Sequence, residues 1–477
     1  MKRILFKFLR YGFFAIVCLV TLLALLVAEE NFRGKREWES YRREHEARGD
    51  RLDFKPLVPP PVPDDQNFAM TPLLRPLFSN ENQYAGELRN KLALPAAKPD
   101  AQLPSLGDRT LGKQMNPDDW RAYFGGEDVL AALQKLAPEL SEISGAVRRP
   151  YARFPIAYEK GYLAALPHIE PLMRLGKIYT LRACVELHEG RTDAALADVQ
   201  TVFRLAESMK NEPLVISELV RISIWTNGLQ AVWEGLADRR WSDAQLSALQ
   251  NDLIRVDFPA GMLMGLHGDR AGLNETMLLT MGSPEILMLL SPRGGKINDK
   301  AMRFIPNCLF YQNMLTINRF YDETVFSHVD PASLRTLSAR FDAAAVKLKT
   351  EVLLRHFGIP VPNLYTVLAA CALPAAGGVI NRSFYAQVLT DEAVVACALE
   401  RYRLANGQYP DALEKLTPAF LQKIPFDAMS GKPLHYRLKD DGTFLLYSVG
   451  SNGKDDGGEV VLQKNGRVDL KQGDWVW

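Results

Sequence analysis

The sequence predicts a mainly α-helical protein with one transmembrane helix near its N-terminus and a small α+β module at its C-terminal end. Three patterns predict this fold class: an uncharged apolar run, apolar residues three and four positions apart through the middle of the chain, and two hairpin turns near its end. The 477 residues, 47% of them hydrophobic, are enough for two or three domains with buried cores.

The charge balance argues against a nucleic-acid partner. The chain has 57 Lys plus Arg and 56 Asp plus Glu, so its formal charge of +1 gives no field that would gather an acidic partner. The cysteines are far apart and form no CxxC pair, so we expect buried free thiols, with disulfides in an oxidising compartment as the alternative. They are Cys18, Cys184, Cys308, Cys371 and Cys397.

Residues 11–28 read YGFFAIVCLVTLLALLVA, which is about the length that a single helix needs to cross a bilayer. Four cations lie in residues 1–10, and Glu29 and Glu30 follow the apolar run. This arrangement predicts a cytoplasmic tail, an anchor in the inner membrane and a periplasmic body, although further cations after residue 32 weaken the bias. A cleaved signal peptide is the alternative, and Leu26 disfavours it because a small residue is expected there.

Residues 29–50 are dense in charges of both signs, which predicts a solvated juxtamembrane helix that stands clear of any core. Residues 51–118 contain many prolines, which favour an extended strap. A free linker would not carry so many apolar residues, so we expect part of the strap to lie across a neighbouring surface. These apolar residues are Phe54, Phe68, Met70, Leu73, Leu74 and Phe78.

Residues 119–357 show helical spacing without β-type alternation and predict a helical domain. Within it, VELHEGRTDAALADVQTVFRLAESMKNEP resembles a single tetratricopeptide unit, with Gly190 at the turn, Ala195 at the close contact and Pro213 at the end. No second copy follows at a fixed period, which favours an irregular helical bundle over a solenoid. Residues 282–298 contain several helix breakers and predict a loop.

Residues 358–384 are expected to form a connector, and residues 385–477 the C-terminal α+β module. Thr390 is a good helix cap, and Asn406 with Gly407 supplies a stop, which predicts a helix over 391–405 with Asp391 and Glu392 in its first turn. The turns Asp440-Asp441-Gly442 and Asn465-Gly466 predict two β-hairpins. Together these elements predict a helix covered by a small antiparallel sheet.

The strings ALERYRLANGQYPDALEKL, IPFDAMSGKPLHYRL and LLYSVGSNGKDDGG, in this order, make the last fifth of the chain resemble the globular domain of the major pseudopilin of type II secretion systems (protein G-like). The start of the chain lacks the pseudopilin leader and its Phe-Thr-Leu-x-Glu helix, so assembly into a fibre is not implied. The whole chain also resembles large membrane proteins of planctomycete and verrucomicrobial bacteria, a resemblance that implies no activity.

The pseudopilin resemblance implies a calcium site in the last loop, which here reads SNGKDDGG followed by GDWVW. Asn452, Asp455, Asp456 and Asp474 would offer the oxygen ligands that calcium prefers. Asn452 stands where the family usually has an aspartate, and Lys454 lies inside the loop, so both reduce the attraction for a dication. A plain solvated turn is the alternative, because Asp and Gly are ordinary turn formers.

No catalytic motif is complete. The segment Gly107 to Lys113 nearly spells a phosphate loop, but Gln114 replaces the hydroxyl residue that ligates magnesium. His188-Glu189 lacks the second His of a zinc protease, and no GxSxG turn occurs. His168 and His356 lie beside helix breakers and are expected to be structural. Trp225 and Trp233 are expected in a helix core, with a peptide-binding groove as the alternative.

The sequence therefore predicts a non-catalytic, membrane-anchored scaffold or interaction protein of the cell envelope. Its expected partners are the lipid bilayer, through the N-terminal helix, and envelope or secretion-machinery proteins. Because catalytic residues can be dispersed in sequence, an exported hydrolase-type enzyme with a pocket in the helical domain is the alternative.

Overall fold

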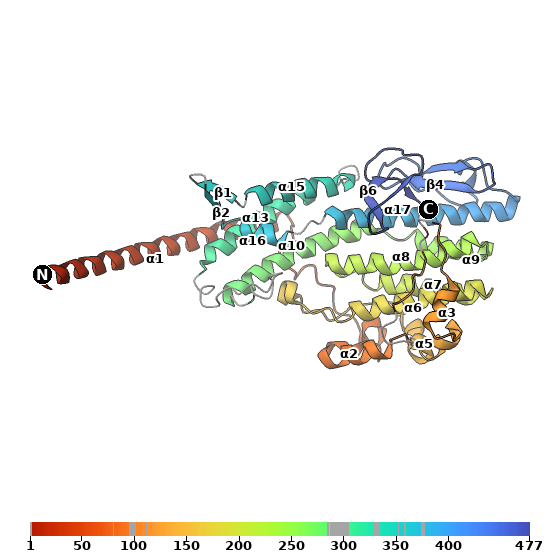
Figure 1. The fold of residues 1–477 in the computed structure, drawn as a ribbon, viewed down its shortest axis with the longest axis horizontal. Coiled ribbons are helices and arrows are strands. Elements are labelled where there is room, and N and C mark those ends of the chain that lie inside the picture. The colour runs from red at the N-terminus through yellow and green to blue at the C-terminus, as the bar shows by residue number, and fades with distance from the viewer. Residues whose placement is uncertain are drawn as a thin grey trace.

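The computed structural model describes residues 2–79, 81–94, 102–107, 109, 112–283, 286, 305–327, 330, 334–351, 353–356, 359–373 and 377–477. It confirms a mainly helical chain with one long apolar helix at its N-terminus and small antiparallel sheets near its C-terminus (Figure 1). The predicted loop over 282–298 lies outside the described residues, apart from 282, 283 and 286.

Helix α1 runs without a break from Lys2 to Ala47 and joins the predicted anchor to the predicted juxtamembrane helix. Its apolar part is exposed, and it is long and apolar enough to cross a membrane. The expectation that residues 29–50 stand clear of any core is wrong, because Trp38 is buried and this half of α1 packs along α13 (Asn307–Tyr321). The other half projects from one end of the molecule (Figure 1).

The strap after α1 lies on the body, as its apolar residues indicated. Phe54, Phe68, Leu73 and Leu74 are buried, and Met70 and Phe78 are partly buried. The strap is not extended throughout, because it also contains several short helical segments. These are the short 3₁₀ helices η1 (Asp64–Gln66), η2 (Phe68–Met70) and η3 (Arg75–Phe78), and the helix α2 (Glu81–Lys91).

The body is an irregular bundle whose centre is formed by α6 (Ile169–His188), α7 (Thr192–Glu207) and α8 (Val215–Ala237). Gly190 takes a positive φ of 78° at the α6–α7 turn, and Ala195 is buried at the contact, as expected. The other elements of the body are α3 (Pro117–Tyr123), α4 (Val129–Gln134), α5 (Ala137–Ala146), η5 (Tyr158–Leu163), α9 (Asp243–Leu253), α10 (Phe258–Gly282), the π-helix η6 (Asp322–Phe326) and α15 (Leu337–Glu351).

The expectation that β structure is absent before residue 357 is wrong. Strands β1 (Leu353–His356) and β2 (Ile359–Pro362) form an antiparallel hairpin in which Leu353 pairs with Pro362. The predicted connector is also largely helical, because it contains α16 (Val367–Ala372) and the first turns of α17 (Gly377–Asn406).

The prediction that Thr390 caps a helix is wrong, because α17 begins at Gly377 and Thr390 lies inside it. Its hydroxyl donates to the Ala386 carbonyl at 2.7 Å and accepts from Trp225 Nε1 at 3.0 Å. The second bond joins α17 to α8. Asp391 and Glu392 are therefore not in a first helical turn. The helix ends at Asn406, with Gly407 at φ 82°, as predicted.

Helix α17 connects the body to the C-terminal module, since it packs against α8, α9, α10 and α15 and also against the strands that follow it. Both predicted hairpins are present. One sheet consists of β3 (His435–Leu438), β4 (Phe444–Ser448) and β7 (Trp475–Val476), in the order β3-β4-β7. A second sheet consists of β5 (Val460–Leu462) and β6 (Val468–Gly473). The short 3₁₀ helix η7 (Leu413–Leu416) precedes both sheets.

One cluster of buried apolar residues extends from Trp38 in α1 to Trp475 in β7. The end of the body that contacts α1 and the C-terminal module therefore share a core. All five cysteines are free, with Cys184, Cys308 and Cys397 buried and Cys371 exposed.

Candidate functional site

The end of α1 enters the body through three side chains on one face of the helix: Trp38, Tyr41 and His45. Their spacing of three and four residues places them in line along the helix. Trp38 is buried, and the Tyr41 and His45 rings stack with their centroids 4.1 Å apart. This face is where α1 is joined to the rest of the chain, and we call it, with Asp50, Arg270 and Asp322, the anchor junction.

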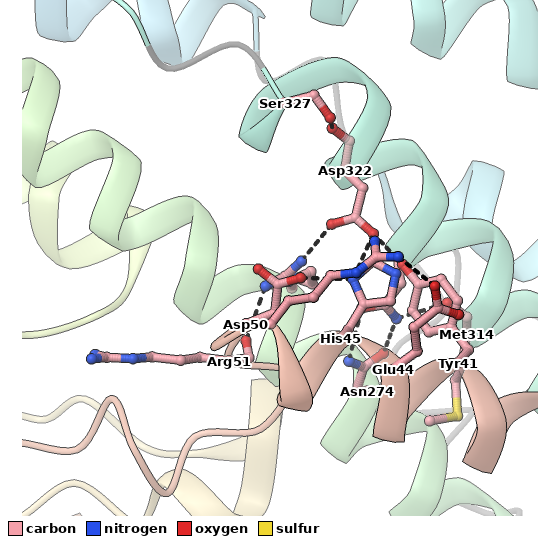
Figure 2. A network of polar contacts seen from close by, with 12 residues as sticks. Tyr41, Glu44, His45, Asp50, Arg51, Asn274, Met314, Asp322 and Ser327 are labelled. Carbon is pink, nitrogen blue, oxygen red and sulfur yellow. Dashed lines mark hydrogen bonds and ion pairs between the residues drawn. The ribbon is translucent and has the colours of Figure 1, made fainter.

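The chain turns back over the junction directly after α1. The Gly49 N–H donates to the Glu46 carbonyl and the Asp50 N–H donates to the His45 carbonyl, and each N–O distance is 3.0 Å. Gly49 has a φ of 91°, which this type of helix end requires of the residue at its position. The turn places the Asp50 carboxylate 2.7 Å from Nδ1 of His45 (Figure 2).

Asp322 approaches the junction from the opposite side, as the first residue of the π-helix η6. Its Oδ2 lies 3.6 Å from His45 Nδ1 and accepts a hydrogen bond from the Tyr41 hydroxyl. Its other oxygen, Oδ1, lies 2.8 Å from Nη1 of Arg270 on α10. Burial and the bond to Asp322 both raise the pKa of Tyr41, so that side chain remains a neutral donor.

Arg270 is fully buried and supplies the positive charge at the junction. Its Nη2 donates to the Arg51 carbonyl at 3.1 Å, and its guanidinium carbon lies 4.4 Å from the centre of the Phe326 ring. Burial lowers the pKa of Arg270, and the nearby Asp322 and Asp50 carboxylates oppose that change. A buried guanidinium without these partners would be costly, so the junction is a set of mutually dependent charges.

A pair of amides extends the junction below Arg270. Asn274 on α10 and Asn318 on α13 exchange hydrogen bonds, with Asn318 Nδ2 donating to Asn274 Oδ1 at 2.7 Å. Asn274 Nδ2 also donates to the Leu52 carbonyl at 2.9 Å. Both side chains are buried, so the pair fixes the start of the strap to α10 and α13.

The ligand atoms of His45, Asp50 and Asp322 lie within 4.8 Å of one another, and in the described part of the chain this is the one group of three His, Cys, Asp or Glu side chains so placed. The group fits an ion-pair network better than a metal. Arg270 and Tyr41 already engage both Asp322 oxygens, and the guanidinium provides the charge that a cation would bring. The arrangement can therefore hold α1 against the body without a further component.

The four residues predicted to bind calcium lie together in the loop after β4 and at the end of β6, but several of their oxygens are engaged. Asp455 Oδ1 accepts from the Tyr447 hydroxyl at 2.8 Å. Asp474 is fully buried and accepts from the Gly458 N–H at 2.7 Å and from the Asp456 N–H at 3.1 Å. The calcium site stays a prediction.

Asn452 and Asp456 complete that loop, where Asn452 Nδ2 donates to Asp456 Oδ2 at 2.9 Å. Burial raises the pKa of Asp474, and the negative charges of Asp456 and Asp455 add to this effect. The loop thus gathers negative charge around Asp474 while its backbone amides close over that carboxylate.

The remaining residues considered in the sequence are spread over the fold. His168 is fully buried, stacks on Phe154 and lies 3.0 Å from Oε1 of Glu212. The described part of the segment 107–113 lies on α8, where the Arg109 N–H donates to Gln230 Oε1 at 3.2 Å. The side chain of His356 lies outside the described residues. Trp225 is a core residue, as expected, whereas Trp233 is half-buried and lines a cavity.

Glu392 has a different role from the one that the sequence suggested. It is fully buried on α17, and no side chain among the described residues donates a hydrogen bond to its carboxylate oxygens. Burial raises its pKa well above the usual value, and the nearby negative charge of Asp427 adds to the rise. Asp427 is also fully buried and accepts from Ser448 Oγ at 2.7 Å. Burial and the charge of Asp427 therefore both favour the protonated form of Glu392 at the contact between α17 and the module.

The junction residues are separated by as many as 281 positions along the chain, so their meeting could not be read from the sequence. One signal was present, because Trp38, Tyr41 and His45 recur at helical spacing within the charged segment. Comparison of the chain with protein-family models, curated proteins and solved structures finds no match.

Proposed function

We propose that this protein is a single-pass, membrane-anchored scaffold of the cell envelope that works by holding its body and C-terminal module against other proteins. The observation that carries the proposal is the continuity of α1, whose exposed apolar half leads without a break into a half that is packed into the body. A helix of this kind fixes the body relative to the bilayer, which a flexible linker would not do.

The anchor junction supports the same proposal. Five side chains from α1, the following turn, α10 and η6 balance one another's charges and hydrogen bonds at the point where the helix enters the body. Such a network stabilises one orientation of two elements, because the buried Arg270 guanidinium would lose its counter-charge if they separated. The geometry suits positioning and leaves no open reactive group there.

The membrane attachment is tested with a chain that lacks residues 2–28. We expect the intact protein to stay in the membrane pellet after alkaline carbonate extraction and the shortened one to be recovered in the soluble fraction. Replacing residues 11–28 with an unrelated apolar run of equal length is the matched control and should restore pelleting. Recovery of the intact protein without detergent would contradict the proposal.

We further propose that the membrane is the inner membrane and that the body lies in the periplasm, since four cations and no acid precede the apolar run. Protease added to spheroplasts should digest the body and spare a tag placed before Lys2. Digestion of the tag with protection of the body would reverse the orientation.

The expected partners are envelope or secretion-machinery proteins that contact the pseudopilin-like module. This module exposes four large apolar side chains, Leu404, Phe426, Leu438 and Leu462. A photo-crosslinking residue at each of these positions should capture an envelope protein in native membranes, and the same residue at exposed Ile254 on the body is the control. Equal capture from Ile254 and from the module would argue against a docking role for the module.

A further inference from the structure

A cavity of about 280 Å³ lies where the end of α8 meets α17, the β3–β4 hairpin and the last residue of the sequence. This volume is near the lower end of the range for small-molecule pockets, which is about 300–1,000 Å³. The rings that line it come from separate segments of the chain: Trp233, Tyr409, Phe444 and Trp477. Tyr409 and Phe444 meet edge to face, with their centroids 5.1 Å apart.

The one acidic side chain in the lining has no capacity left for a ligand. Glu400 is 2% exposed, and Arg403 donates to both of its oxygens, at 2.6 and 2.8 Å. The Tyr409 hydroxyl also donates to Glu400 Oε2 at 2.8 Å. The negative charge of Glu400 is therefore already balanced by Arg403.

Arg239 is the one basic side chain in the lining, and among the described residues no acid forms an ion pair with it. Its neighbour Asp238 is turned away, since Asp238 Oδ1 accepts from Gln114 and Oδ2 lies 4.0 Å from His188. Arg239 lines the cavity together with Tyr409, and its positive charge opposes the rise that burial causes in the pKa of Tyr409.

The backbone of Arg239 is strained in a way that no other residue of the described chain shares. Its φ is 53°, and every other positive φ in the described residues belongs to a glycine. Arg239 follows α8 with the hydrogen bonds of a Schellman helix end, Arg239 N–H to Leu236 O and Arg240 N–H to Gly235 O. Such strain points to a use for the side chain that offsets its cost.

Three other helices end in the same way and provide an internal comparison. In α1, α3 and α6 the same pair of hydrogen bonds is present, and the position that Arg239 occupies after α8 is held by Gly49, Gly125 and Gly190. Glycine is the residue that this position accommodates without steric cost. Among these four helices, α8 alone has an arginine at this position, and that arginine lines the cavity.

We propose that this pocket binds a small organic carboxylate with a flat apolar body. The carboxylate pairs with the planar fork of Arg239, and the flat body packs against the aromatic walls by offset or edge contacts. The proposal is independent of the scaffold function, because the pocket lies in α8, α17 and the module and includes no residue of α1.

The test uses the full-length protein in detergent and two probes of equal shape, indole-3-acetate and the neutral indole-3-acetamide, with affinity measured by calorimetry. We expect indole-3-acetate to bind about tenfold or more tightly, because a hydrogen-bonded charge pair is present only with the acid. Equal affinity for the two probes, or no binding of either at millimolar concentration, would overturn the proposal.

The Arg239→Gly variant should lose the preference for the acid while its melting temperature stays the same or rises, since glycine relieves the strain. Arg239→Asn, which also tolerates this backbone conformation, should behave in the same way. Arg240→Ala removes a neighbouring charge outside the lining and should leave the preference intact. A preference for the acid that survives Arg239→Gly, or that Arg240→Ala also abolishes, would contradict the assignment.

Discussion

Nη1 of Arg270, a side chain with no exposed surface, lies 2.8 Å from Oδ1 of Asp322, the residue at which α13 changes into a π-helix. The π-helix is a local irregularity that shifts side chains by one position, and such irregularities are frequent at functional positions. Here the Asp322 carboxylate contacts both Arg270 on α10 and the side chains of Tyr41 and His45 on α1.

Replacing this arginine should destabilise the protein strongly. In Arg270→Met the carboxylates of Asp322 and Asp50 lose their buried counter-charge, and we expect unfolding in detergent to become easier by about 3–5 kcal/mol. Arg319→Met is the matched control, because the Arg319–Glu37 pair is exposed and should contribute at most about 1 kcal/mol. Equal losses in the two variants would show that the junction is not the stabilising element.

The hydrogen bond between Trp225 and Thr390 should be needed for packing between α8 and α17. Thr390→Val keeps the shape of the side chain but removes the acceptor of a buried indole N–H, and should cost about 1–3 kcal/mol in a denaturant titration. Thr390→Ser keeps the hydroxyl and loses one methyl, which should cost about 1 kcal/mol. A serine variant less stable than the valine variant would contradict this role.

Glu392 should make stability depend on pH. Its pKa is raised in the folded state, so its contribution is complete below the unfolded value near 4.5 and is lost as the pH rises toward the folded value. Between pH 5 and 8 the free energy of unfolding should therefore fall more steeply in the wild type than in Glu392→Gln. The difference is at most about 1.4 kcal/mol per pH unit.

The control for that measurement is Glu414→Gln, at an exposed position in the same module. This variant should follow the wild-type curve over the whole pH range. If Glu392→Gln also follows the wild-type curve, the carboxyl does not titrate as its burial requires.

The predicted calcium site is tested by melting the full-length protein with chelator and with calcium. If the loop binds calcium, the free energy of unfolding should increase by about 2.7 kcal/mol when free calcium is 100 times the dissociation constant. Asp456→Asn should remove the increase, and Asp440→Asn in the exposed β3–β4 turn should not. An unmoved midpoint at millimolar calcium would eliminate the site.

The elements that the sequence predicted well are those with strong local signals. The apolar run of α1, the glycine at the α6–α7 turn and the two hairpin turns each specify their structure through the residues themselves. Thr390 shows where local signals fail. Its side chain would cap a helix in isolation, but burial against Trp225 makes the continuation of α17 through it the better solution.

The residues of the anchor junction could not be predicted from the sequence for a related reason. Charged residues in the segment after the apolar run were expected to be solvated, yet His45 lies against Asp322 on η6, which in turn pairs with Arg270 on α10, and both are far away in the chain. Only the aromatic spacing of Trp38 and Tyr41 marked that face of α1 as one to be covered. The ion-pair network could be found only once the fold had brought these segments together.

The first hydrogen bond between α1 and the body has a geometric consequence. Asn31 Oδ1 accepts from the Cys308 N–H at 2.7 Å, only three residues past the apolar run, and three residues of helix rise about 4.5 Å. If α1 spans a bilayer, the end of the body that contacts α1 would thus lie among the lipid headgroups, because no spacer separates it from the apolar run. The C-terminal module lies at the opposite end of the long axis (Figure 1) and would be the part that reaches farthest from the bilayer.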